Sequence, residues 1–388
     1  MSLSSWFQRK ASAATRALTL WLPLPPASPL KPRYEQLVQE GYARNSVLHA
    51  CVREIAGAAA AVPWVLYRRD GHGDFEELAD HPLLSLLRRP NPFMGGFEWV
   101  EALMTHLYLS GNSYIEAAGA PHAPPGELYC LRPDRMQVIP DRAEYIAGYE
   151  YRVAGETVRF ARDQVLHIKL FHPADDWYGL SPVQVAALAV DKLNASDRWN
   201  TALLQNSAVP SGALVSKKRL TDEQFERLKN EMHAKLQGIS HARLPLLLEE
   251  DLDWKELGVT PRDMDWIQGL RFSALQIAQI YNVPPELIGL QPATHQNRRE
   301  ARKALYTEVV LPALVRLRDA LNRWLAPRFG KDLELDFNTD RIDALAEDRE
   351  SLWRRVNQCR FLTLNEKREL LGYEPLPNGD RLPDPARV

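Results

Sequence analysis

The chain has 388 residues, of which 45% are hydrophobic and 25% are charged, and these are ordinary values for a globular protein. Its formal net charge of −2 argues against strong overall attraction to nucleic acid, so any such contact would have to come from a local cluster of charge. Cys51, Cys130 and Cys359 lack the paired spacing of a disulfide framework or a zinc site, which favours a reducing, cytoplasmic setting.

Residues 1–40 are expected to form a flexible N-terminal arm. Residues 11–24 follow Arg9 and Lys10 as a signal peptide would, but Arg16 interrupts the apolar run and prolines crowd its end. No segment approaches the ~20 apolar residues that a membrane-spanning helix needs. The sequence therefore predicts neither secretion nor a membrane span, although an arm that docks on a partner or a membrane surface is an alternative.

Residues 41–180 predict a mixture of helices and short antiparallel strands. Helical periodicity covers residues 47–62, 81–87 and 97–109, and Pro63 and Pro90 break the chain after the first two. A strand at 64–68 follows the first helix and turns back at Asp70-Gly71-His72-Gly73, as the start of a hairpin. Further short strands are expected at 113–117, 127–131, 136–140, 149–153, 157–160 and 165–169.

A long helix over residues 181–208 and a compact insert over residues 209–260 follow. Ser181 is a good N-cap, Pro182 suits the first helical position, and Gln184 can complete a capping box. Within the insert we expect a strand at 213–216, a helix capped by Thr221, and two strands at 244–248 and 253–257.

Residues 261–289 predict a second long helix, which runs from Asp263 and stops at Val283-Pro284-Pro285. A proline has no amide hydrogen and restricts the residue before it, so helices seldom continue through such a pair. A polar connection over residues 290–297 then leads to a longer helix from Arg298.

Pro312 lies inside this longer helix, which continues to Leu325. It removes the hydrogen bond to the carbonyl of Glu308 and is expected to bend the helix rather than end it. After the helix we expect a strand at 333–337 and a helical pair at 343–358 and 365–371. The tail over residues 375–388, with its four prolines, is expected to be loosely held.

A basic cluster with one acidic member opens the helix that starts at Arg298, and its local net charge is about +3: Arg298, Arg299, Arg302, Lys303 and Glu300. A basic start is unexpected, because the positive end of the helix dipole favours anions. The cluster indicates a solvated face, salt bridges between subunits, or a surface that faces phosphates. The connection before it ends in short polar donors that can touch a nucleic-acid backbone: His295, Gln296 and Asn297.

Motifs for catalysis or cofactor binding are not found in the sequence. It contains no phosphate-binding loop, no dinucleotide fingerprint and no nucleophile elbow. His167 and His172 have poor metal geometry. The aspartate pairs at 175–176, 251 with 253, and 263 with 265 could bind magnesium in a nuclease, but their places at element boundaries favour turns and caps. We therefore predict no catalytic residue, no metal site and no cofactor.

Short patterns recur in a fixed order over roughly residues 46–380. They are the helix-to-strand segment 46–67 with Val62-Pro63, then His81-Pro82-Leu83, Pro90-Asn91-Pro92, Gly111-Asn112-Ser113-Tyr114, Leu131-Arg132-Pro133, Tyr178-Gly179-Leu180-Ser181-Pro182, Pro210-Ser211-Gly212, Val283-Pro284-Pro285-Glu286-Leu287-Ile288-Gly289, and Leu362-Thr363-Leu364-Asn365-Glu366 with Gly372. None is specific alone, but the ordered set resembles the portal protein family of tailed double-stranded DNA phages, in its Hong Kong 97-like branch.

The resemblance implies an α+β portal-type subunit. Residues 41–180 would form an α+β wing, residues 181–208 and 261–289 two long stem helices, and residues 209–260 a small α/β clip. Residues 290–297 would form a tunnel loop and residues 298–340 a kinked wing helix with its strand. Residues 341–388 would form a short helical crown and the C-terminal tail.

The resemblance also implies a function without catalysis, in a ring of about twelve copies. The ring would assemble in the bacterial cytoplasm and sit at the portal vertex of the virion capsid. Its partners would be double-stranded DNA bound without sequence specificity, the terminase large subunit, the head-tail adaptor and the major capsid protein, with no membrane. Whether the particle is an infectious phage, a prophage product or a gene transfer agent is not distinguished.

Two groups of residues follow from the resemblance as site candidates. The DNA channel would involve the tunnel loop and the basic cluster: His295, Gln296, Asn297, Arg298, Arg299, Arg302 and Lys303. We expect Gln296 and Asn297 to contact the duplex, and the basic residues to steer it or to brace neighbouring loops. Docking at the clip would use six charged residues, for which the alternative interpretation is solvated surface charge: Lys217, Lys218, Arg219, Glu249, Glu250 and Asp251.

Two other classes of function stay as alternatives. One is a metal-dependent nuclease, or another DNA-processing enzyme, that uses the paired aspartates. The other is a DNA-binding adaptor that forms no ring.

Overall fold

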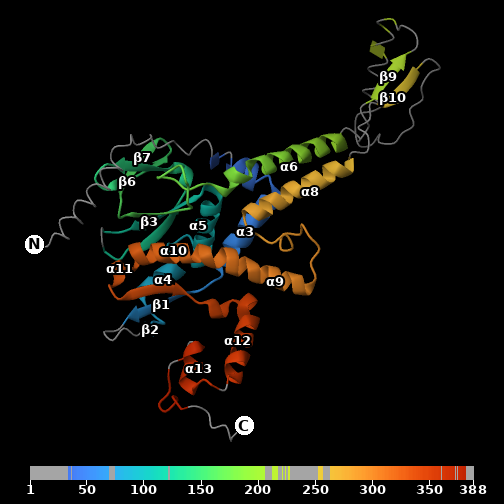
Figure 1. Ribbon diagram of the computed structural model, residues 1–388. Coiled ribbons are helices and arrows are strands. Elements are labelled where there is room, and N and C mark those ends of the chain that lie inside the picture. The colour runs from blue at the N-terminus through green and yellow to red at the C-terminus, as the bar shows by residue number, and fades with distance from the viewer. Residues whose placement is uncertain are drawn as a thin grey trace, which may run out of the picture.

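The computed structural model of the protein describes residues 34–35, 37–69, 75–120, 123–205, 212–216, 221, 223, 226–227, 252–256, 263–359, 361–371, 373 and 375–381. Two long helices, α6 (Pro182–Gln205) and α8 (Asp263–Ile280), run side by side and project from an α+β body (Figure 1). Strands β9 (Gly212–Ser216) and β10 (Leu252–Glu256) form an antiparallel pair beyond the outer end of these helices.

The body contains helices α3 (Ser46–Ala60), α4 (Pro82–Arg88) and α5 (Gly96–Ser110), close to the predicted segments. Asn45 caps α3, because its Oδ1 accepts a hydrogen bond from the Leu48 amide at 2.9 Å. The Asn45 side-chain amide also donates to Asn194 Oδ1 in α6 at 3.2 Å. One residue thus starts a body helix and ties it to a projecting helix.

The strands of the body form small antiparallel sheets, which confirms the α+β prediction. One has the order β4-β3-β8: β4 (Glu127–Leu131), β3 (Asn112–Ala118) and β8 (Val165–Lys169). A second has the order β5-β6-β7: β5 (Met136–Asp141), β6 (Tyr145–Val153) and β7 (Glu156–Ala161). A third has the order β11-β1-β2: β11 (Leu333–Phe337), β1 (Trp64–Arg69) and β2 (Phe75–Glu77).

The N-terminal boundary of the folded part differs from the predicted arm over residues 1–40. Tyr34 is 5% exposed, and its hydroxyl lies 2.7 Å from Nδ1 of His106 in α5. A π-helical turn at Leu37–Tyr42 follows, and Asn194 of α6 donates a hydrogen bond to the Glu40 carbonyl at 2.7 Å. Tyr34 and the turn at Leu37–Tyr42 therefore belong to the body, because an aromatic anchor and long-range hydrogen bonds hold them there. Residues 1–33 lie outside the described residues.

A close approach of two glycines joins the start of α6 to the end of α5. Gly111 ends α5 with a φ of 76°, and a Cβ added to Gly179 would lie 2.0 Å from the Gly111 carbonyl oxygen. Asn112 Oδ1 accepts the Gly179 amide at 2.8 Å, and the Ser181 hydroxyl donates to the Leu109 carbonyl at 2.6 Å. Ser181 also caps α6, as predicted, by accepting the Gln184 amide at 3.2 Å.

The helix predicted from Arg298 to Leu325 is a continuous run of helical segments with a change of hydrogen-bond pattern inside it. It comprises α9 (His295–Leu305), a π-helical turn at Tyr306–Val310 and α10 (Leu311–Trp324), and the short α11 (Ala326–Phe329) follows. The Leu311 amide bonds to the Tyr306 carbonyl, five residues back. Pro312, which has no amide hydrogen, lies in the first turn of α10, two residues after this π-helical turn, and the helix passes the proline without ending.

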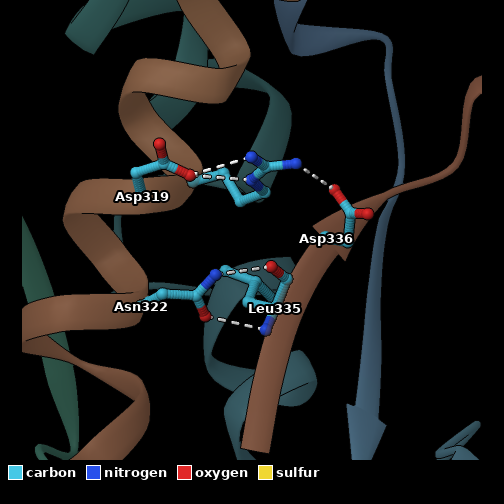
Figure 2. Close-up of polar contacts among 5 residues, drawn as sticks. Asp319, Asn322, Leu335 and Asp336 are labelled. Atoms are coloured by element: carbon cyan, nitrogen blue, oxygen red, sulfur yellow. Dashed lines mark hydrogen bonds and ion pairs between the residues drawn. The ribbon is translucent and has the colours of Figure 1, made fainter. Parts of the chain in front are cut away.

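Strand β11 lies at the edge of its sheet, and α10 covers its outer backbone. The Asn322 side chain accepts the Leu335 amide at 2.8 Å and donates to the Leu335 carbonyl at 2.7 Å (Figure 2). Arg318 bridges Asp336 of the strand, at 3.1 Å, and Asp319 of its own helix, at 2.9 Å (Figure 2). The main-chain groups of Leu335 are therefore satisfied by one side chain of α10, and a salt bridge adds a second link between helix and strand.

Replacing Asn322 with alanine is expected to lower the free energy of unfolding by about 2 kcal/mol, because both polar groups of the buried Leu335 backbone lose their partner. Urea unfolding, followed by tryptophan fluorescence, measures this change. Asn357→Ala, at an exposed position of α12 (Ala346–Gln358), is the control and should stay within about 0.5 kcal/mol of the wild type. Equal losses in the two variants would contradict the role given to Asn322.

The C-terminal part contains α12 and α13 (Leu364–Leu370), and α13 begins with the predicted Thr363–Glu366 capping box. The expectation of a loosely held tail from residue 375 is wrong for its first residues. The Asn365 Oδ1 accepts a hydrogen bond from the Leu376 amide at 2.7 Å, and the main-chain amide of Asn365 donates to the Gly379 carbonyl at 2.9 Å. The Asn365 side-chain amide also donates to Asp380 at 2.8 Å, so one buried asparagine anchors the segment up to that residue.

Candidate nucleic-acid interface

The segment between α8 and α9 begins with a tight helix end. Asn282 adopts a left-handed conformation with a φ of 52°. The Val283 amide donates to the Ala278 carbonyl at 2.9 Å and the Asn282 amide to the Gln279 carbonyl at 3.0 Å, which is the pattern of a Schellman motif. Val283 is 2% exposed and anchors the chain to the body as it leaves the helix.

The next residues fold back on the body instead of forming a free loop. The Leu287 amide donates to the Pro284 carbonyl at 3.1 Å, and the Leu290 amide to the Pro285 carbonyl at 3.0 Å. Leu287 is buried, and Ile288 and Leu290 pack partly buried against the core. The segment leaves the body only after Leu290.

The helix that follows starts earlier than the sequence predicted. Thr294 is its N-cap, because its Oγ1 accepts the Asn297 amide at 3.2 Å, and the first helical residue is His295. The predicted loop over 290–297 is therefore wrong at both ends. Residue 290 is packed, and residues 295–297 form the first helical turn. The prediction placed the helix start at the first charged residue and overlooked the threonine cap.

Exposed polar side chains gather on this helix start: His295, Gln296, Asn297, Arg298 and Arg299. The first three helical residues are polar, and Arg298 and Arg299 follow directly as the fourth and fifth, still close to the positive end of the helix dipole. This tip presents donors and positive charge together.

The remaining two members of the basic cluster do not share this exposure. Arg302 is half-buried, and its guanidinium lies 2.8 Å from a carboxylate oxygen of Glu54 in α3. Lys303 is also half-buried. The buried Ala301 and Leu305 turn this side of α9 toward the body. The sequence grouped all four basic residues into one surface, but the structure separates Arg298 and Arg299 from Arg302.

Glu54 adds a negative charge to the basic cluster, and the sequence did not identify it. It lies 248 residues before Arg302, so no local spacing relates the two. Counting Glu54 with the cluster lowers the local net charge from about +3 to about +2.

The other residues that the sequence singled out either make ordinary structural contacts or lie outside the described residues. The Asp175 carboxylate accepts the amides of Trp177 at 2.7 Å and Tyr178 at 3.0 Å, which is the predicted turn role. His167 bonds to Asn112 at 3.0 Å and stacks on Tyr114, as a packed core histidine does. The clip candidates lie outside the described residues: Lys217, Lys218, Arg219, Glu249, Glu250 and Asp251.

The described residues contain no group of three or more His, Cys, Asp or Glu side chains placed to hold a metal ion. Among the helices of the same residues, none has the length and apolar character to cross a membrane.

Comparisons with known proteins give consistent matches. The family described as "Phage portal protein" matches residues 46–372. A protein of Rickettsia bellii is 39% identical over 88% of this chain and 90% of its own length. The portal protein of Enterobacteria phage HK97 is 25% identical over 86% of this chain and 80% of its own. A chain in the neck of a native gene transfer agent particle, computed with C12 symmetry, is 42% identical over 88% of this chain and 94% of its own, with a TM-score of 0.70.

Proposed function

The chain belongs to the phage portal protein family, and from this premise we propose that about twelve copies form a ring at one capsid vertex through which double-stranded DNA enters and leaves the particle. The likeness to a neck chain solved with C12 symmetry supports a closed ring of this size. The match covers most of both chains, so it concerns the whole subunit.

The parts of the subunit take their roles from this assembly. The α+β body up to residue 180 is the wing, and α6 and α8 are the stem. The β9–β10 pair belongs to the clip, which docks the terminase large subunit during packaging and the head-tail adaptor afterwards. The charges proposed for that docking are those at residues 217–219 and 249–251. The helices α12 and α13 form the short crown, and the outer surface of the ring meets the major capsid protein.

The tip formed by residues 295–299 lines the passage in this proposal. Its support is the combination of exposure, short polar donors and positive charge at one helix start. Gln296 and Asn297 touch the phosphate backbone, and Arg298 and Arg299 attract it. Arg302 has a different role, because its salt bridge with Glu54 holds α9 against α3.

The modest charge of this tip suits a passage better than a binding site. Each phosphate that a protein neutralises adds affinity through counterion release, so a strongly basic ring would hold the DNA instead of letting it slide. With two exposed arginines per subunit on a chain of net charge −2, the attraction is local and weak.

Replacing Arg298 and Arg299 with glutamate is expected to lower the amount of packaged DNA at least about twofold, because the tips around the passage then repel phosphates. The length of nuclease-protected DNA, measured by gel electrophoresis of purified particles, reports the effect. Ring assembly, seen by negative-stain electron microscopy, should be unchanged.

The matched control is the Arg298→Lys, Arg299→Lys variant, which keeps the charge and should package nearly normally. The single Arg298→Glu variant should give an intermediate length. Full-length DNA in the double glutamate variant would exclude this tip from the passage.

The family is structural, and the portal function needs no catalysis by this chain. Negative-stain images of the purified protein should show rings with a central hole, whereas an adaptor that forms no ring would not. Incubation with duplex DNA and Mg²⁺ separates a portal, which leaves the DNA uncut, from a metal-dependent nuclease.

A further inference from the structure

The C-terminal helices α12 and α13 enclose a groove of about 480 Å³ whose apolar lining stays exposed. Trp353 and Leu364 are each 51% exposed, and Tyr373, in the segment after α13, is 49% exposed. Val356 and Leu371 line the same groove and are more buried. Large apolar side chains that gather in one open groove mark a surface that another group covers.

The rim of this groove combines aromatic rings with positive charge. The Arg368 guanidinium lies 5.5 Å from the centre of the Tyr373 ring. Lys367 and Arg354 also line the groove, and Arg354 pairs with the carboxylate of Glu350 at 2.8 Å. The local net charge is therefore about +2. Grooves lined with aromatic rings bind extended, proline-containing segments, so this groove suits such a segment with a negative charge.

The chain itself leads its C-terminal residues to this groove. Asn365, which follows Leu364 of the groove lining, donates a hydrogen bond from its side-chain amide to the Asp380 carboxylate at 2.8 Å. Gly379 is packed so closely on Asn365 that an added Cβ would lie 2.1 Å from Oδ1. Arg381, the last described residue, therefore lies beside the first turn of α13.

The seven residues after Arg381 have the composition that the groove suits. Five of them are apolar, two prolines flank an aspartate, and the order is Leu382-Pro383-Asp384-Pro385-Ala386-Arg387-Val388. Prolines favour an extended conformation with a rise of about 3.1 Å per residue, so seven residues span about 22 Å. The part of α12 that lines the groove, from Glu350 to Asn357, is only about 10 Å long.

We propose that residues 382–388 return as an extended segment into the groove between α12 and α13 of the same chain. The apolar side chains of the segment cover Trp353 and Tyr373, and Asp384 faces the positive charge of Lys367. A segment tethered a few residues away is present at an effective concentration of about 1 mM or more, which favours it over a second copy. The inference is independent of the proposed ring, because groove and segment belong to one chain.

A chain that ends at Arg381 lacks the segment and provides the first test. The amides of α13 are expected to exchange with deuterium at least about tenfold faster than in the full chain, because opening the helical pair then costs less free energy. Hydrogen exchange followed by mass spectrometry measures the rates peptide by peptide. Helix α5 serves as the internal reference and should be unchanged. Equal exchange of α13 with and without the segment would overturn the proposal.

A substitution in the groove shows whether the segment acts there. In the Trp353→Ala variant, removal of residues 382–388 should change the exchange of α13 by less than about twofold, because the main contact of the segment is already lost. Phe361→Ala is the matched control. Phe361 is 76% exposed and is not part of the groove lining, so removal of the segment should keep its full effect in that variant. Equal effects of the removal in the two variants would overturn the groove as the docking place.

The dependence on protein concentration identifies the chain that supplies the segment. Docking within one chain predicts the same acceleration of exchange in dilute subunits and in assembled rings, since the tether fixes the effective concentration. An acceleration found only in rings would mean that a neighbouring subunit supplies the segment, and it would overturn docking within the chain.

Discussion

Replacing Gly179 with alanine is expected to lower the free energy of unfolding by about 4 kcal/mol, at the upper end for single substitutions. The added Cβ would lie 2.0 Å from the Gly111 carbonyl oxygen and 2.8 Å from the Leu170 amide nitrogen. Both are main-chain atoms, so no side-chain rotation relieves the overlap. The backbone at the start of α6 would have to move away from α5.

Urea unfolding at equal protein concentration measures the loss, since ring formation would make the apparent stability depend on concentration. Gly57→Ala is the matched control. Gly57 lies within α3, and a Cβ there meets nothing within 4 Å. That variant should be more stable than the wild type by up to about 1 kcal/mol, because alanine favours the helix. A Gly179→Ala variant as stable as the wild type would contradict the close approach of the two glycines.

Most elements of the body were predictable because their signals are local. The capping pattern at Ser181, the proline that ends α3 and the alternation in β11 each depend on neighbouring residues, and the structure confirms them. The π-helical turn before Pro312 shows the limit of this reasoning. The missing amide predicts a disturbance, but the preceding helix decides whether the chain bends, breaks or shifts its hydrogen bonds.

Long-range contacts account for what the sequence did not predict. Tyr34 belongs to the fold because of His106, and the start of the tail is held because Asn365 reaches Leu376 and Gly379. The candidate interface shows the same effect. Composition identified the basic cluster, but only the fold pairs Arg302 with Glu54 and leaves Arg298 exposed.

Acidification from pH 7 to pH 4 is expected to remove about 3 kcal/mol of stability for each of two partly buried histidines, His106 and His167. Burial lowers the pKa of His106 to about 4, with a smaller contribution from Arg132 that Asp134 opposes. Burial also lowers the pKa of His167 to about 3, and the nearby charge of Lys169 adds to this shift.

The direction of the effect follows from where protons bind. In the unfolded chain both imidazoles take up a proton near pH 6.5, whereas in the folded protein they stay neutral until about pH 4 and about pH 3. The unfolded state therefore binds more protons throughout this window, and protonation favours unfolding. The stabilisation is complete above pH 6.5 and is lost as the pH falls toward the folded-state pKa values.

His167→Gln is expected to halve the pH dependence contributed by the two histidines. The variant loses the titrating group but keeps an amide that can reach Asn112, the present hydrogen-bond partner of His167. Urea unfolding at a series of pH values between 7 and 4 measures the slope. Asn357→Ala is the control, because it changes an exposed side chain that does not titrate, and it should keep the wild-type slope. If the slope is the same in wild type and His167→Gln, the partly buried imidazole is not the group whose protonation destabilises the fold in acid.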